Sequence, residues 1–83
     1  MTKFGQDTYS FMVASDVQRN GLGLEAWRHE ADGQHTLVAE VFYSDDRQDM
    51  HFSTFEADLP IQLIEHLTSV ARVRLAPTDE AAE

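Results

Sequence analysis

Apolar and polar residues alternate along most of residues 8–57, which is the pattern of β-strands that bury one face. Turn-forming residues divide this region into four runs. We predict strands near 8–19, 22–31, 34–44 and 49–57, joined in sequence order as an antiparallel meander. The apolar residues of the first run also fit helical spacing, so a helix over 8–19 is the alternative.

Three turns set the expected pairing of these strands. Asn20-Gly21 and Asp32-Gly33 have the chemistry of two-residue hairpin loops, in which both central residues need a positive φ. The segment 45–48 suits a four-residue loop. These loops predict the cross-strand pairs Val17 with Leu24, Asp16 with Glu25, Ala14 with Trp27, Val13 with Arg28, Trp27 with Val38, Glu25 with Glu40, Leu24 with Val41, Leu22 with Tyr43, Tyr43 with Met50, Val41 with Phe52 and Val38 with Phe55.

A helix is expected after the strands, from Leu59 to about Leu75. Apolar residues recur there at three- and four-residue spacing, and Pro60 and Pro77 suit its start and its stop. We therefore predict one α+β domain over 1–76, a four-stranded antiparallel β-meander with one C-terminal α-helix packed on one face. The acidic segment 77–83 is expected to be a disordered tail.

The predicted registers give the sheet two different faces. The face expected beneath the helix collects Tyr9, Phe11, Val13, Val17, Leu22, Leu24, Ala26, Leu37, Ala39, Val41, Tyr43, Met50 and Phe52. The opposite face carries one row of Ala14, Trp27, Val38 and Phe55, with Phe42 nearby, and a second row of Asp16, Glu25, Glu40 and Ser53. Aromatic side chains therefore border a line of carboxylates.

Like charges directly opposite each other destabilise a sheet, so this acidic row suggests that a cation is meant to bind there. We predict a partner-binding surface formed by Asp16, Glu25, Trp27, Glu40, Phe42 and Phe55. The partner is either a basic protein or a second copy of the chain that supplies Arg19 or Arg28. The alternative is that this face has no partner: its carboxylates are solvated and its aromatic side chains are scattered surface residues.

Charge and composition narrow the classes of partner. The 83 residues have a formal net charge of -9, which repels nucleic acid and anionic membranes. No stretch has the roughly 20 apolar residues of a membrane span. The absence of cysteine excludes thiol chemistry. We therefore expect a cytoplasmic, protein-binding chain that binds neither nucleic acid nor membranes.

The sequence gives only a weak signal for catalysis or metal binding. The spacing of the four histidines matches no common metal-ligand motif, so we expect no cofactor and no catalytic residue. The alternative is a metal-binding or small hydrolytic protein that uses Glu25, Glu40 and His51. Asp49, His51 and Ser53 name the members of a hydrolase triad, but residues two apart on a strand project in parallel, about 7 Å from each other.

Overall fold

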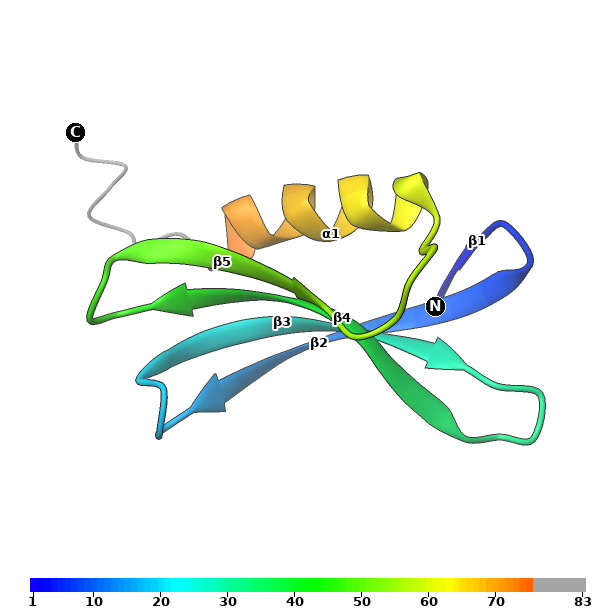
Figure 1. Ribbon diagram of the computed structural model, residues 1–83, viewed down its shortest axis with the longest axis horizontal. Coiled ribbons are helices and arrows are strands. Elements are labelled where there is room, and N and C mark those ends of the chain that lie inside the picture. Colours follow the sequence, from blue (N-terminus) through cyan, green and yellow to red (C-terminus); the bar gives the residue numbers. More distant parts are fainter. Residues whose placement is uncertain (76–83) are drawn as a thin grey trace.

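The computed structural model describes residues 1–75, which form an antiparallel sheet and one helix (Figure 1). The elements are β1 (Thr2–Phe4), β2 (Asp7–Asp16), β3 (Gly21–His29), β4 (His35–Ser44), β5 (Asp49–Thr54) and α1 (Ile61–Arg74). The strands lie in sequence order, β1-β2-β3-β4-β5. The predicted α+β class is confirmed, but the sheet has five strands and not four. The predicted tail at 77–83 lies outside the described residues.

The additional strand is β1, which pairs with the start of β2. Phe4 lies opposite Asp7, so Gly5 and Gln6 form a two-residue loop. Gly5 has a φ of 63°, the positive value that a two-residue hairpin of the Gly-X kind needs at its first central position. This turn chemistry is present in the sequence, but β1 is too short to show the alternation of apolar and polar residues that identifies a strand.

The pairing of β2 with β3 differs from the prediction by four residues. Val13, and not Val17, lies opposite Leu24, because the connection is a four-residue loop over 17–20. The loop is closed by the backbone N–H of Asn20, which donates to the oxygen of Val17 over 3.3 Å. Val17 is consequently 91% exposed and does not join the core. The helix alternative for 8–19 is wrong.

The same correction applies to the other predicted pairs of β2. The structure places Asp16 opposite Gly21, Ala14 opposite Gly23, Ser10 opposite Trp27 and Tyr9 opposite Arg28. A shift of four residues is even, so every side chain of β2 keeps its predicted face.

The pairing of β3 with β4 is confirmed up to a β-bulge. Glu25 pairs with Glu40, Leu24 with Val41 and Leu22 with Tyr43, but beyond Ala26 the register shifts and Trp27 pairs with Leu37. The cause is a three-residue loop over 31–33, in which only Gly33 has a positive φ, in place of the expected two-residue loop. Val38 is the extra residue of the bulge.

The bulge changes which face two residues occupy. Val38 is fully buried in the core and not on the face expected to bear Trp27. Leu37 pairs with Trp27 and therefore lies on the face away from the helix, and not beneath the helix as predicted. The pairs Tyr43 with Met50 and Val41 with Phe52 are confirmed. Strand β5 ends at Thr54, and the N–H of Phe55 donates to the oxygen of Val38 over 2.9 Å.

Helix α1 covers one face of the sheet, as Figure 1 shows. Its residues Leu63, Leu67 and Ala71 recur at four-residue spacing and are fully buried against the sheet. The helix contacts β3 and β4, which leaves Met50 and Phe52 of the edge strand β5 36% and 46% exposed. Within residues 1–75, no helix has the length and apolar character needed to cross a membrane.

Candidate functional site

The sheet face opposite α1, called the open face below, is the predicted binding surface. Strand alternation and the observed pairing assign its residues. They include Ser10, Met12, Ala14 and Asp16 of β2, Gly21, Gly23, Glu25 and Trp27 of β3, Leu37, Glu40 and Phe42 of β4, and His51 and Ser53 of β5. The same alternation, continued one residue past the end of β5 at Thr54, adds Phe55.

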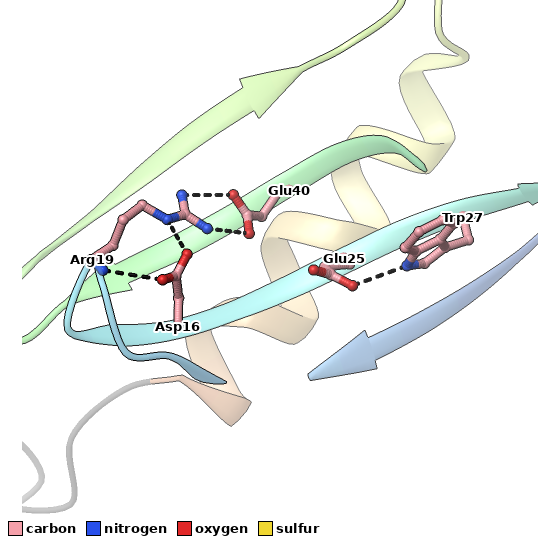
Figure 2. A network of polar contacts seen from close by, with 5 residues as sticks. All are labelled: Asp16, Arg19, Glu25, Trp27 and Glu40. Carbon is pink, nitrogen blue, oxygen red and sulfur yellow. Dashed lines mark hydrogen bonds and ion pairs between the residues drawn. The ribbon is translucent and has the colours of Figure 1, made fainter. Parts of the chain in front are cut away.

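Arg19 occupies the acidic row of the open face (Figure 2). Its Nη1 and Nη2 donate to the two carboxylate oxygens of Glu40 over 3.1 and 2.9 Å. Its Nε donates to Oδ2 of Asp16 over 2.5 Å, and its backbone N–H donates to Oδ1 of the same side chain over 3.1 Å. One guanidinium therefore bridges two carboxylates, with a planar bidentate geometry at Glu40.

This arrangement, called the Arg19 cluster, also includes an aromatic ring. The Arg19 guanidinium carbon lies 3.9 Å from the centroid of the Phe42 ring, a cation–π contact. Glu40 and Phe42 are each only 6% exposed, because Arg19 and the neighbouring strand cover them. A charge as buried as that of Glu40 is stable only with a partner and hydrogen bonds, and Arg19 supplies both.

The electrostatics of the cluster follow from these contacts. The hydrogen bond from the Arg19 side chain, joined by that from its backbone, lowers the pKa of Asp16 below its ordinary value. Hydrogen bonds to Glu40 and then to Asp16 raise the pKa of Arg19, so its charge is fixed at every accessible pH.

Two glycines of β3 provide the space for the cluster. A Cβ at Gly23 would lie 2.6 Å from Oε2 of Glu40, and a Cβ at Gly21 would overlap the carbonyl oxygen of Tyr43 and the ring of Phe42. Glu40 and Phe42 can therefore lie across β3 only because these two positions lack side chains. The glycines serve side-chain packing and not a phosphate loop.

The remainder of the open face stays accessible. The indole Nε1 of Trp27 donates to Oε1 of Glu25 over 3.0 Å (Figure 2). Met12, directly opposite Glu25, is 51% exposed, and Phe55 is 53% exposed. Within residues 1–75, Glu25 has no ion pair with a basic side chain. This carboxylate is thus half-buried among apolar side chains, without a basic partner in the described residues.

The six predicted site residues therefore fall into two groups. Asp16, Glu40 and Phe42 are held by Arg19 and are unavailable as primary contacts, whereas Glu25, Trp27 and Phe55 remain accessible. Sequence reasoning missed Met12 as a member of the surface and Arg19 as an internal partner. The signal for Arg19 was its position three residues after Asp16 in a turn.

The second arginine named as a possible cation faces the helix side. Arg28 donates through Nη1 and Nη2 to Glu56, over 2.5 and 2.8 Å, and through Nε to Glu30 over 3.0 Å. The hydroxyl of Thr36 also donates to Glu30. Arg28 therefore fastens the segment before the helix to the sheet and takes no part in the open face.

The residues of the alternative chemistry each contact another side chain, although Glu25 and Glu40 are cross-strand neighbours. Glu40 binds Arg19, Glu25 accepts from Trp27, and His51 Nε2 lies 2.6 Å from Oδ1 of Asp49. Across residues 1–75, no group of three or more His, Cys, Asp or Glu side chains has an arrangement that could hold a metal ion.

Although Nε2 of His51 lies 2.6 Å from Oδ1 of Asp49, it makes no hydrogen bond within the described residues, so the two side chains do not form the hydrogen-bonded pair that a triad requires. Ser53, the third member of the supposed triad, makes no hydrogen bond to His51 in the described part of the chain.

Comparisons of the chain with protein-family models, with curated proteins and with solved structures found no significant match.

Proposed function

We propose that this chain is a non-catalytic protein-interaction module that binds a basic region of a partner protein through the open face. The observation that supports this most directly is the half-buried carboxylate of Glu25. It lies beside Met12 and Trp27, and no basic side chain of residues 1–75 neutralises it.

The surroundings of Glu25 suit a protein partner. Trp27 pairs with Leu37 across the sheet, and Phe55 follows the next strand on the same face, so apolar groups border the carboxylate. Interface centres are rich in aromatic residues and methionine, and the residues that carry most binding energy lie in such surroundings. An Arg or Lys of the partner would meet Glu25 while its apolar neighbours cover Trp27 and Phe55.

The Arg19 cluster has a supporting role in this proposal. Because Arg19 holds Asp16 and Glu40 in place, a partner does not have to neutralise them, and their positions are fixed before binding. The proposed contact centre is therefore Met12, Glu25, Trp27, Leu37 and Phe55.

Charge favours a foreign basic partner over a second copy. Each chain carries a formal charge of -9, and stacking two open faces would bring two sets of carboxylates together without a new cation. A basic partner instead gains from long-range attraction, which raises the association rate at low salt.

The test is site-specific photo-crosslinking in cells that express the full chain. A photoreactive residue at Phe55 is expected to give a discrete adduct with a protein of basic isoelectric point. Glu25→Lys should abolish this adduct, because it replaces the neutralising charge by a repelling one. The matched control carries the photoreactive residue at Val73, which is exposed on α1, away from the open face.

Two results would contradict the proposal. The same adduct from positions 55 and 73 would mean that capture does not depend on the open face. An adduct at position 55 with twice the mass of the chain, confirmed as a dimer by sedimentation, would assign the face to a second copy.

A further inference from the structure

A groove lies between the edge strand β5 and helix α1, on the side of the sheet away from the open face. It has a volume of about 350 Å³. Val41, Tyr43, Met50 and Phe52 line it with apolar surface, and Thr68 and Arg72 line it from the helix. This volume is in the range of sites that bind ligands of the size of a few side chains.

The backbone of β5 is unpaired along the edge that borders this groove. Phe55 N–H donates to Val38, and hydrogen-bonded positions alternate along an antiparallel pair. The N–H and C=O groups of Met50, Phe52 and Thr54 therefore point away from β4. No further strand covers them, because β5 is the last strand of the sheet formed by residues 1–75.

Strand β5 also lacks the usual protection of an exposed edge. Over Asp49–Thr54 it contains neither proline nor lysine, and it is six residues long. Its outward backbone groups belong to the same residues whose side chains, Met50 and Phe52, line the groove. An added strand would therefore gain hydrogen bonds and apolar contacts together.

One charged side chain of the groove is unpaired. Arg72 lies on the last turn of α1 and is exposed, and no acidic side chain of residues 1–75 pairs with it. In a chain with a net charge of -9, this guanidinium is a local positive site. Arginine binds carboxylates with two parallel hydrogen bonds, so it specifies an acidic group in an occupant.

We infer that this groove binds an extended peptide segment of another protein, which adds to β5 as a further strand, places alternate apolar side chains against Met50 and Phe52, and offers a carboxylate to Arg72. A second copy of the chain is a poorer occupant. Pairing β5 with itself brings another Met50 and Phe52, but the strand supplies only Asp49 as an acid, and Asp49 already lies 3.8 Å from Arg47.

The experiment uses phage-displayed random octapeptides panned against the full chain, followed by fluorescence anisotropy on an enriched synthetic peptide. Enriched sequences are expected to alternate apolar and polar residues and to contain an Asp or Glu at a constant position. Arg72→Glu should weaken binding about tenfold or more and, in a second panning, select Lys or Arg at that position.

The matched control is Arg74→Glu, which makes the same charge change on the same helical turn at a residue that does not line the groove. It should change the affinity by less than about twofold, because an exposed charge outside the contact is screened by solvent and salt. N-methylation of alternate peptide amides should remove binding, since these amides pair with β5.

Several results would overturn the inference. These are a failure to enrich any peptide, equal effects of the two glutamate substitutions, or binding that survives methylation of every peptide amide. A concentration-dependent dimer that Phe52→Lys converts to monomer would assign the edge to a second copy.

Discussion

Arg19 determines which parts of the open face a partner can reach. Its guanidinium contacts Asp16, Glu40 and the ring of Phe42, so three side chains that the strand pattern presents as exposed are joined in one internal cluster. Bidentate pairing depends on the planar guanidinium, and a lysine at this position would satisfy the two carboxylates less completely. The proposed function therefore assigns contact with the partner to Glu25 and its apolar neighbours.

Gly23 and Gly21 should respond differently to alanine, because their methyl groups would meet different atoms. At Gly23 the methyl meets the mobile carboxylate of Glu40, whereas at Gly21 it meets the backbone carbonyl of Tyr43. We expect Gly21→Ala to lower the free energy of unfolding by about 3 kcal/mol and Gly23→Ala by about 1 kcal/mol. Urea unfolding followed by circular dichroism measures both.

A double-mutant cycle separates the two mechanisms. In a Glu40→Ala background the cost of Gly23→Ala should disappear, because the carboxylate that it displaces is gone, while the cost of Gly21→Ala should persist. An unchanged cost of Gly23→Ala in that background would show that Glu40 is not what excludes a side chain there.

At the scale of elements, the loop and the bulge of the β3–β4 hairpin have opposite effects on the direction of the β4 side chains, and these effects cancel. The loop at 31–33 has one residue more than a two-residue turn, which would reverse the faces of β4, and the bulge at Val38 restores them. Glu25 consequently still meets Glu40. The acidic row therefore depends on the bulge as much as on the turn.

The helix-to-sheet contact is the main source of core burial, and Leu67 lies in it with no exposed surface. Leu67→Ala should lower the free energy of unfolding by about 2–5 kcal/mol, the range for large buried side chains. Val73→Ala, on the exposed side of the same helix, should change it by less than about 0.5 kcal/mol. Chemical denaturation measures both, and similar values for the two variants would place the helix contact elsewhere.

At the scale of the whole molecule, acid should destabilise the fold through three carboxylates. The pKa of Asp16 is lowered by the Arg19 hydrogen bonds, that of Glu56 by the Arg28 hydrogen bonds, and that of Glu30 by the hydrogen bonds from Thr36 and Arg28. Each folded-state pKa lies below its ordinary value, 3.8 for Asp and 4.5 for Glu. The stabilisation is therefore complete above those values and is lost as the pH falls through the folded pKa values.

Differential scanning calorimetry should accordingly give a Tm that declines as the pH is lowered from about 5 to about 3. Arg28→Met should reduce this dependence, because Glu30 and Glu56 lose the cation that lowers their pKa values. Arg74→Met, for which residues 1–75 offer no acidic partner, is the control and should keep the wild-type profile. Identical profiles for all three proteins would contradict the assignment to the Arg28 pairs.

The two interaction surfaces proposed here lie on opposite sides of the sheet. The open face is acidic and apolar, whereas the groove beside β5 combines apolar side chains with the unpaired Arg72, and its one acidic residue, Asp49, is already paired with Arg47. They are therefore expected to select partners of opposite charge. Helix α1 contributes to this difference, since it contacts β3 and β4 more closely than β5, where Met50 and Phe52 stay partly exposed.

Strand alternation and helical spacing in the sequence by themselves determined the α+β class, the order of the main elements and the face of most side chains. Period-two alternation distinguishes odd shifts between strands from even ones, because only an odd shift turns a side chain to the other face. It could not detect the four-residue shift of β2, which leaves Val13 and Leu24 on the same face as before. The pattern therefore located the open face without giving its pairing.

Tertiary structure alone decided the length of each loop, the bulge at Val38 and the position of Arg19 above Glu40. These depend on which backbone groups find hydrogen-bond partners and on the space beside Gly21 and Gly23, both of which arise only when distant segments meet. The separation of the six predicted contact residues into a held group and an accessible group has the same origin.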